Sequence, residues 1–276
     1  MLSFPVKTMK LRSCDTPFDS ADHVFEVKWD GIRCVMHFSK NQVRLQSRTG
    51  RDCTSRFPEL WSPELSADEA VLDGELVVLT GGKPDFYAVM ERYHAGQRRT
   101  RVIVNTLPAQ YVVWDILRVN GRDVTRLPLA ERKELLVKTI TTRNQIIPAD
   151  WVDGEGVALF NAVKQWELEG IVAKRKDGKY LPGKYGDWLK IKNYRYASLD
   201  VMGISKKNGS VLVGHEGKVL ARAMGITAES RDVLRKLHVV HETKDARFFA
   251  SGYIARVKYT VGPRGIRDCV WVGFDR

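Results

Sequence analysis

Short hydrophobic runs alternate with polar turns over the first 80 residues of the chain, a pattern that predicts β-strands. The predicted strands there are residues 24–28, 34–38, 42–46 and 76–79, separated by Gly and Asn positions. A helical period of apolar residues then predicts helices over residues 86–96, 129–139 and 161–169, with Gly170 ending the last of them. Further strands are expected at residues 111–117, 171–174 and 188–192.

The pattern of hydrophobic and polar residues changes near Ser198, where short β-like runs become dominant. These runs cover residues 199–204, 211–215, 218–223, 254–260 and 270–274, and one helical pattern interrupts them at residues 228–238. A small barrel with a single helix fits this pattern, and the oligonucleotide-binding (OB) fold is the commonest such module. We therefore predict an α+β protein with two domains, residues 1–196 and residues 197–276.

The distribution of charged residues supports the division into two domains. The 276 residues contain 45 Lys and Arg against 33 Asp and Glu, a net charge of +12 that favours an anionic partner, with nucleic acid ahead of a membrane. Residues 197–276 hold 14 of these basic and 8 of these acidic residues, so the smaller domain is over twice as basic per residue. The four cysteines are scattered, and no apolar run is long enough to span a membrane. We expect a cytoplasmic protein with no membrane partner.

Lys28 is the first candidate for chemistry. It ends a predicted strand in the string EVKWDGIR, where Asp30-Gly31 supplies a tight turn and Arg33 follows. A lysine that is partly desolvated among other cations can act as a nucleophile. By itself the string also fits a charged hairpin.

Charged residues in other predicted strands argue against that simple hairpin. Asp73 and Glu75 lie in and beside an apolar run, where ionised carboxylates are costly unless they are paired or bind a metal. Lys190 and Lys192 share one face of a predicted strand, because strand side chains repeat every two residues. Two lysines on one face beside acidic strands suggest a phosphate site with a divalent cation.

The order of these motifs resembles that of the covalent nucleotidyltransferases, which include ATP-dependent DNA ligases, RNA ligases and mRNA-capping guanylyltransferases. The similarity covers nearly the whole chain and is greatest to bacterial ATP-dependent DNA ligases, above all the ligase domain of the end-joining enzymes. The strings that carry it are EVKWDGIR (26–33), LQSRTG (45–50), RFPEL (56–60), DGEL (73–76), WDIL (114–117), LPLAERKELL (127–136), EGIVAK (169–174), RKDGKYLPG (175–183) and WLKIK (188–192).

The resemblance implies a fold and a reaction. The first domain should be a nucleotidyltransferase (ATP-grasp-like) adenylation domain of antiparallel sheets and helices, and the second a small OB-fold β-barrel. Lys28 should attack the α-phosphate of ATP, expel pyrophosphate and form lysyl-AMP. AMP should then pass to the 5′-phosphate of a DNA nick, and the 3′-hydroxyl should displace it. Mg²⁺ or Mn²⁺ is the expected metal.

The same resemblance implies roles for individual residues. Glu26 matches the position that recognises adenine, and Trp114 matches the aromatic residue that stacks on the base, where Phe or Tyr is usual. Metal binding falls to three carboxylates, namely Asp73, Glu75 and Glu169, of which Glu75 also lies near the ribose. The expected contacts to the nucleotide or to the nick phosphate are Arg33, Arg48, Lys174, Lys184, Lys190 and Lys192, with Lys184 standing where many relatives have Arg.

The last motif of the family, usually Arg-x-Asp-Lys, is expected in the small barrel. Here the sequence ends in Gly-Phe-Asp-Arg, so the motif is either abbreviated or replaced by Arg267 and Arg276. Self-adenylation is the step that this departure would affect. Two other functions stay open: an RNA ligase or capping-type nucleotidyltransferase, and a non-catalytic nucleic-acid-binding protein on a ligase scaffold.

The expected partner is nicked duplex DNA in repair or end joining. We expect a monomeric ligase, associated with the bacterial nucleoid and without additional DNA-binding, polymerase or nuclease domains. A Ku-type end-binding protein is a further partner that resemblance to the end-joining enzymes suggests.

Overall fold

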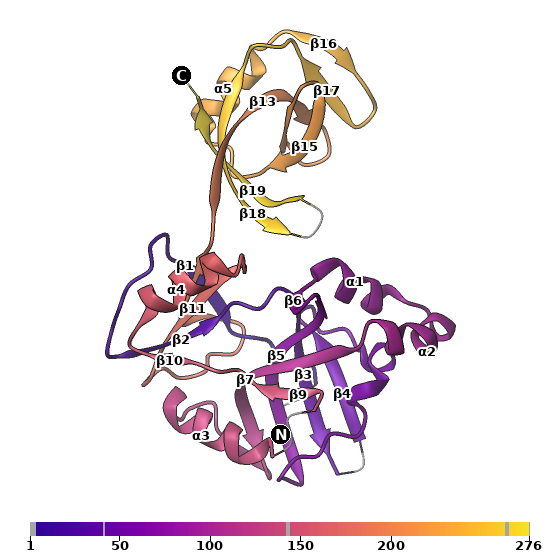
Figure 1. The fold of residues 1–276 in the computed structure, drawn as a ribbon, viewed down its shortest axis with the longest axis vertical. Helices are drawn as coiled ribbons and strands as arrows, with labels where there is room; N and C mark the ends of the chain where they lie inside the picture. Colours follow the sequence, from indigo (N-terminus) through magenta and orange to yellow (C-terminus); the bar gives the residue numbers. More distant parts are fainter. Residues whose placement is uncertain (1–3, 41, 142–143, 263–264, 276) are drawn as a thin grey trace. The chain divides into compact units, whose positions relative to one another are not determined.

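The computed structural model describes residues 4–40, 42–141, 144–262 and 265–275 (Figure 1). The chain divides into two compact units, Met1–Asn193 and Tyr194–Arg276. The sequence placed this division three residues later, after residue 196. Arg276, which the sequence analysis named as a substitute for a missing motif residue, lies outside the described residues.

One sheet of the first unit carries the strand order β1-β12-β11-β2-β10. Its strands are β1 (Lys10–Ser13), β2 (His23–Val27), β10 (Val152–Asp153), β11 (Gly170–Arg175) and β12 (Tyr185–Lys192). β2 and β12 run antiparallel to β11 on its two sides, while β1 runs parallel to β12. We call this the lysine sheet, because Lys28, Lys174, Lys190 and Lys192 lie in or directly after its strands.

The second sheet of this unit has the order β4-β3-β5-β7-β8, with β6 paired to β5 and β9 to β7. Its strands are β3 (Ile32–Ser39), β4 (Gln42–Ser47), β5 (Glu69–Thr80), β6 (Lys83–Pro84), β7 (Ala109–Val119), β8 (Arg122–Asp123) and β9 (Ile146–Pro148). We call this the carboxylate sheet, because β5 carries Asp73 and Glu75. Buried side chains from both sheets, such as Val35 and Val172, form one core between them.

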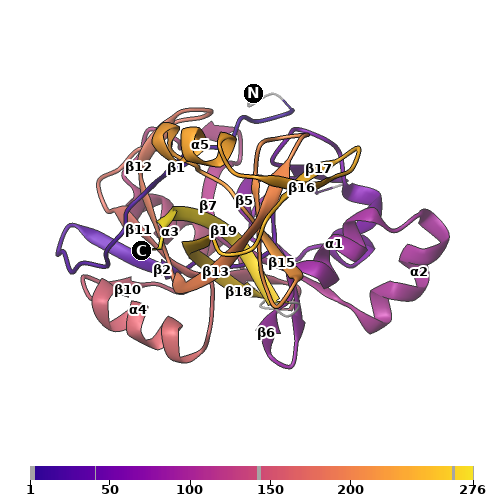
Figure 2. The same ribbon diagram turned by 90° about the horizontal axis from the view of Figure 1, so that it is seen from above.

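Helices cover the first unit on opposite sides. α1 (Phe86–His94) and α2 (Gln97–Thr106) lie on the side away from α4 (Gly156–Gln165) in both views (Figures 1 and 2). α3 (Leu129–Thr139) packs against β7 and buries Leu129 and Leu136. Two 3₁₀ turns, Thr54–Arg56 and Pro58–Leu60, follow β4.

The second unit is built on an antiparallel sheet of order β15-β14-β13-β17-β16, in which β13 also pairs with β18 and β18 with β19. Its elements are β13 (Arg195–Ser205), β14 (Val211–His215), β15 (Lys218–Ala223), α5 (Ala228–Arg235), β16 (Val239–Glu242), β17 (Ala246–Phe249), β18 (Ile254–Gly262) and β19 (Gly265–Phe274). Leu234 of α5 joins the core formed by Val213, Val257 and Trp271. The short β-like runs of this part of the sequence are therefore strands, and the helix predicted at residues 228–238 is α5.

Several predicted elements need correction. The helix expected at residues 161–169 is α4, which begins at Gly156 and ends at Gln165, so Gly170 does not end a helix but opens β11. The basic segment at residues 97–106 is the helix α2, where the sequence analysis predicted no helix. β16 and β17 were not predicted. α2 has a strongly basic sequence that hid its helical backbone.

No helix in the described part of the chain is long and apolar enough to cross a membrane.

Candidate active site

Lys28 is held by a carboxylate from a distant part of the chain. It directly follows β2, and its backbone N–H donates to the carbonyl of Gly170 at 2.9 Å. Its Nζ atom donates to Oε2 of Glu169 at 2.7 Å. The other oxygen of Glu169 lies 3.1 Å from Nζ of Lys192. One carboxylate therefore lies between two lysines.

The register of the lysine sheet produces this arrangement. Gly170 of β11 lies opposite Lys192 of β12, and Ile171 lies opposite Val27 of β2. Glu169, which immediately precedes β11, is thereby brought between the ends of β2 and β12. Gly170 is required here: its φ is 151°, and a Cβ atom would lie 2.2 Å from the carbonyl oxygen of Ile191.

Glu26 and Lys174 form a buried ion pair on the same sheet. Glu26 lies on β2 two residues before Lys28, so the two side chains point to the same side of the sheet. It is 2% exposed, and its Oε2 lies 2.7 Å from Nζ of Lys174. That ammonium lies 4.3 Å from the ring centre of Trp188 and 5.4 Å from that of Trp114. Burial lowers the pKa of Lys174 to about 8, although the charge of Glu26 opposes this shift.

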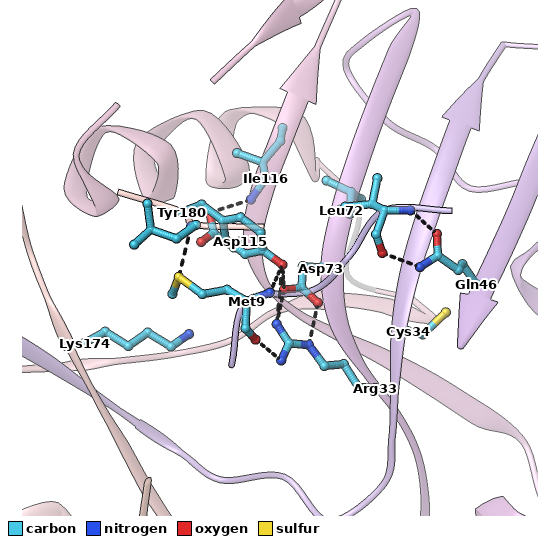
Figure 3. Close-up of polar contacts among 12 residues, drawn as sticks. Met9, Arg33, Cys34, Gln46, Leu72, Asp73, Asp115, Ile116, Lys174 and Tyr180 are labelled. Atoms are coloured by element: carbon cyan, nitrogen blue, oxygen red, sulfur yellow. Dashed lines mark hydrogen bonds and ion pairs between the residues drawn. The ribbon is translucent and has the colours of Figure 1, made fainter. Parts of the chain in front are cut away.

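Arg33 and Asp73 form a third pair, in the carboxylate sheet (Figure 3). Arg33 donates from Nε and from its terminal nitrogen to the two oxygens of Asp73, at 3.0 and 2.7 Å. The hydroxyl of Tyr180 donates to Asp73 at 2.8 Å, and Arg33 also donates to the carbonyl of Met9 at 2.7 Å. Asp73 is completely buried. Both of its carboxylate oxygens are therefore occupied by side chains of the chain itself.

Glu75 has a different environment from Asp73. It lies two residues further along β5, opposite Arg33 of β3. No hydrogen bond or ion pair engages its carboxylate among the described residues. Burial raises its pKa to about 8, a shift that the charges of Lys28 and Arg33 oppose and that of Glu169 reinforces. Within the described part of the chain, Glu75 is thus a carboxylate without a partner, close to the charges of Lys28 and Glu169.

A glycine brings the Lys28 turn against Glu75. A Cβ atom at Gly31 would lie 2.2 Å from the carbonyl oxygen of Leu76 and 2.9 Å from Cγ of Glu75. The absence of a side chain lets the turn after Lys28 touch β5. The lysine and the carboxylate sheets therefore meet at this turn.

The structure does not bring every predicted residue into this cluster. Lys190 of β12 lies opposite Val172 of β11, which in turn lies opposite Glu26 of β2. Lys190 is on the same sheet face as Lys192. Arg48 is exposed in the turn after β4, and Lys184 is exposed just before β12. Neither Arg48 nor Lys184 is held against Lys28 by a described contact.

Three further residues belong to the site, and the sequence analysis gave them no role. Lys133 of α3 lies 2.5 Å from Oε1 of Glu26. Tyr180 bonds Asp73, and Trp188 lies directly opposite Lys174 in the β11–β12 pair. Both Trp188 and Tyr180 stand in strings that carried the resemblance, which was the available signal. Lys133 also stands in one of these strings, LPLAERKELL (127–136), but a lysine in a helix rich in Glu and Lys is typical of a solvated surface, so its burial was not indicated.

Among the described residues, three of the four buried side-chain polar atoms without a hydrogen bond lie near Glu26 and Lys174, and the fourth is Nε of Arg92 in α1. Within the described residues, Oε1 of Glu26, Nε1 of Trp114 and Nζ of Lys133 are buried without a hydrogen bond, so the first and last of these meet as an ion pair only. Buried donors and acceptors without hydrogen bonds are costly, so they mark places where a ligand can supply the missing bonds. A planar ring with hydrogen-bonding edges fits such a set.

The carboxylates available to a metal are few. No group of three or more His, Cys, Asp and Glu side chains is arranged as a metal site in the ranges that the structure describes. Glu169 contacts Lys28, and Glu75 lies close enough for the charges of both residues to shift its pKa. These two carboxylates suit a Mg²⁺ ion, which is commonly held by one or two carboxylates and substrate phosphates.

Comparison with known proteins agrees with this geometry. The family model for the ATP-dependent DNA ligase domain matches residues 1–192. The chain is 32% identical over 257 residues to the SPbeta prophage-derived DNA ligase-like protein LigB of Bacillus subtilis, covering 92% of each chain. It is also 32% identical to the multifunctional non-homologous end joining protein LigD of Mycobacterium bovis, covering 90% of this chain but 35% of that protein.

Solved structures agree as well. The mycobacterial DNA ligase D complexed with ATP and MES shares 25% identity, with a TM-score of 0.62 over 98% of this chain and 95% of that one. A Lig E DNA ligase has the same fold, with a TM-score of 0.68 over 98% of this chain and 99% of that one, at 16% identity. With its family model covering the sheets that hold Lys28 and Glu169, the chain belongs to the family of ATP-dependent DNA ligases.

Proposed function

We propose that this ligase seals nicks with a 5′-phosphate and a 3′-hydroxyl in duplex DNA, and that Lys28 carries AMP between ATP and the nick. The observation that carries the proposal is the contact of Lys28 with Glu169 at 2.7 Å, on a sheet face that also bears Lys174, Lys190 and Lys192. This places one potential nucleophile among several cations, as transfer of a phosphoryl group requires.

In the first step, Nζ of Lys28 attacks the α-phosphorus of ATP. A P–N bond forms, the P–O bond to pyrophosphate breaks, and Nζ gives up a proton. Glu169 lies at hydrogen-bond distance and can orient the amine and receive that proton. Lys192, on the other side of the carboxylate, is placed to neutralise charge on the α-phosphate.

In the later steps, an oxygen of the DNA 5′-phosphate attacks the phosphorus of lysyl-AMP and displaces Lys28. The 3′-hydroxyl of the nick then attacks the 5′-phosphate of the DNA-adenylate and releases AMP. Both steps are again phosphoryl transfers, in which positioning and charge neutralisation provide most of the catalysis. We assign Arg33, held by Asp73, and the exposed Arg48 to the nucleotide or the nick phosphate.

For the nucleotide, we assign the base to the region around Glu26 and Trp114. Oε1 of Glu26 is a buried acceptor without a hydrogen bond and can take one from the amino group of adenine. Trp114 offers an indole ring beside Lys174 and Arg33. Lys174 and Lys190 are assigned to the phosphates of the nucleotide, and the exposed Lys184 to the nucleotide or the nick phosphate.

For the metal, we assign Mg²⁺ or Mn²⁺ to Glu75 and Glu169. Such an ion neutralises phosphate charge when it is bound. Asp73, the third carboxylate of the sequence prediction, is engaged by Arg33 and Tyr180, which supports a role in positioning Arg33.

We further propose that the first unit is the adenylation domain and that the second is an OB-fold that contacts DNA. In the second unit, tyrosines at and just before the start of β13 lie beside cationic side chains of β18. Nζ of Lys258 lies 4.9 Å from the ring centre of Tyr194, and the guanidinium of Arg256 lies 5.6 Å from that of Tyr196, which is 57% exposed. The exposed Arg256 and the half-buried Lys258 are cations that suit a phosphate backbone.

The relatives named LigD are end-joining proteins, which supports a role in DNA repair or end joining. We propose that the chain acts there as a monomer. A Ku-type end-binding protein would be its partner at double-strand ends, which co-purification with that protein on linear DNA tests.

A nick-sealing assay tests the proposal as a whole. The wild-type chain is given nicked duplex DNA with ATP and Mg²⁺, or pre-adenylated nicked DNA without ATP. We expect sealing of both substrates. Sealing of the pre-adenylated nick alone would assign the defect to lysyl-AMP formation or to AMP transfer, both of which that substrate bypasses, and sealing of neither would overturn the proposed function. GTP-dependent sealing, or sealing of RNA nicks only, would contradict the choice of ATP and DNA.

A further inference from the structure

Helix α3 directs two consecutive basic residues into the interior of the first unit. Arg132 is completely buried and donates to both oxygens of Asp115, each at 2.8 Å. It also donates to the carbonyls of Leu127 and Gly178, at 2.6 and 2.9 Å. These bonds fix the helix on β7. The position of the next residue, Lys133, is fixed with it.

Lys133 reaches the carboxylate of Glu26. Its Nζ lies 2.5 Å from Oε1, while Nζ of Lys174 lies 2.7 Å from Oε2. Lys133 is 2% exposed, and its ammonium lies 4.4 Å from the ring centre of Trp151. Glu26 is therefore shared between two buried lysines, one at each oxygen.

The two lysines differ in what else they can reach. Lys174 lies on β11 beside the rings of Trp114 and Trp188, on the sheet face that bears Lys28 and Lys192. In the proposed reaction it serves the phosphates of ATP. Lys133 comes from an anchored helix, and Trp151 covers its ammonium. Lys174 is thus the lysine that can leave Glu26 to bind a nucleotide phosphate, and Lys133 is the lysine that remains paired with Glu26.

The charge of Glu26 depends on these partners. Burial raises the pKa of this carboxyl, but Lys133 and Lys174 together lower it below its ordinary value, and Lys133 has the larger effect of the two. A buried carboxylate left with no cation is strongly destabilised. If Glu26 depended on Lys174 alone, turning that lysine to a phosphate would leave the carboxylate without a counter-charge.

We propose that Lys133 is a positioning residue, which holds the Glu26 carboxylate in place and so frees Lys174 to bind the α-phosphate of ATP. This inference rests on the proposed function of Lys28 and Lys174. Its consequence is kinetic: without Lys133, Glu26 retains Lys174, and the chain binds ATP but transfers AMP slowly.

The test measures the rate of lysyl-AMP formation against ATP concentration for wild type, Lys133→Met and Lys133→Arg. Lys138→Met is the matched control, because Lys138 lies on the same helix and is exposed. We expect Lys133→Met to lower the maximal rate by about tenfold or more with a smaller change in the half-saturating ATP concentration, since an interaction made only as the reaction proceeds affects the maximal rate. Lys133→Arg should restore most of the rate, and Lys138→Met should not alter it.

A second comparison covers the case in which Lys133→Met does not fold. Glu26→Gln and Glu26→Gln/Lys133→Met leave no buried carboxylate for Lys133 to hold, so both should react at the same rate. A further loss in the double variant would overturn the inference, as would wild-type rates in Lys133→Met. If the wild type and Lys138→Met form no lysyl-AMP either, the proposed function fails instead.

Discussion

Lys28 and Glu169 are in direct contact, with Nζ donating to Oε2 across 2.7 Å. The two residues are 141 positions apart and meet because β2 and β11 are neighbours in one sheet. Since Lys192 shares the same carboxylate, Glu169 is the counter-charge of two lysines that face the proposed α-phosphate site. Removing this carboxylate deprives both Lys28 and Lys192 of their shared counter-charge.

Glu169→Gln should therefore slow lysyl-AMP formation by about 10²–10³-fold, the usual effect of losing one well-placed polar group at a reacting centre. Labelled AMP on the chain, followed over time after ATP is added, measures this rate. Glu167→Gln is the control, because Glu167 is 50% exposed and pairs with Lys83 at the surface. Equal rates for the two variants would show that Glu169 has no part in the step.

Gly31→Ala should destabilise the first unit. The new Cβ atom would overlap the carbonyl oxygen of Leu76 and Cγ of Glu75, at 2.2 and 2.9 Å. Overpacking of this kind costs about 1–3 kcal/mol, and pushing the Lys28 turn away from β5 should also slow adenylation. Denaturant unfolding measures the first effect. At Gly96, the N-cap of α2, a methyl group would meet no other atom within 4 Å, so Gly96→Ala should cost only the poorer helix capping of Ala and leave the adenylation rate nearly unchanged.

Asp73→Asn should act mainly on stability. It removes the charge that pairs with Arg33 in a buried setting, a loss of about 3–5 kcal/mol. Asp68→Asn breaks the exposed pair with Lys40 and should cost less than about 1 kcal/mol. Chemical unfolding of both variants tests this contrast. A loss of stability no larger at Asp73 than at Asp68 would contradict the structural role.

Glu75→Gln should stabilise the chain while it impairs catalysis. The folded chain holds the proton of Glu75 up to a pKa of about 8, whereas the ordinary value is 4.5. Between these pH values the unfolded chain releases a proton that the folded chain keeps, so rising pH favours unfolding. Glu75→Gln has no carboxyl group to titrate, so it does not lose this stability. In the wild type the loss reaches its full size above pH 8.

The measurement is a pair of thermal unfolding curves at pH 5 and pH 8.5, without nucleotide or metal. We expect Glu75→Gln to exceed the wild type in melting temperature by at least about 2–4 °C at pH 8.5, the shift that 1 kcal/mol produces in a domain of this size. The gain should be clearly smaller at pH 5. An equal gain at both pH values would contradict a raised pKa.

Local patterns predicted much of the first unit. The helix expected at residues 129–139 is α3 with the same bounds, and the alternation around Lys190 and Lys192 places both on one strand face. Turn signals at Asp30-Gly31 correctly separated β2 from β3. These features depend on neighbours along the chain, which a single sequence displays directly.

Features that depend on distant neighbours were not predicted. Lys133 lies in a helix with Glu and Lys on several sides, so nothing in its surroundings indicates that it is buried against Glu26. Asp73 and Glu75 are alike in sequence, yet only Asp73 is engaged by Arg33. α4 was misplaced because the polar end of its sequence resembles a helix terminus while tertiary packing begins it at Gly156.

The central claim is that Lys28 becomes covalently linked to AMP, and the most direct measurement is incubation of the chain with ATP labelled on the α-phosphate. The account predicts that the wild type retains the label through denaturing electrophoresis and that Lys28→Ala, with unchanged thermal stability, retains none. Acid, which cleaves a P–N bond, should release the label from the wild type. Labelling of Lys28→Ala to the wild-type level would contradict the account.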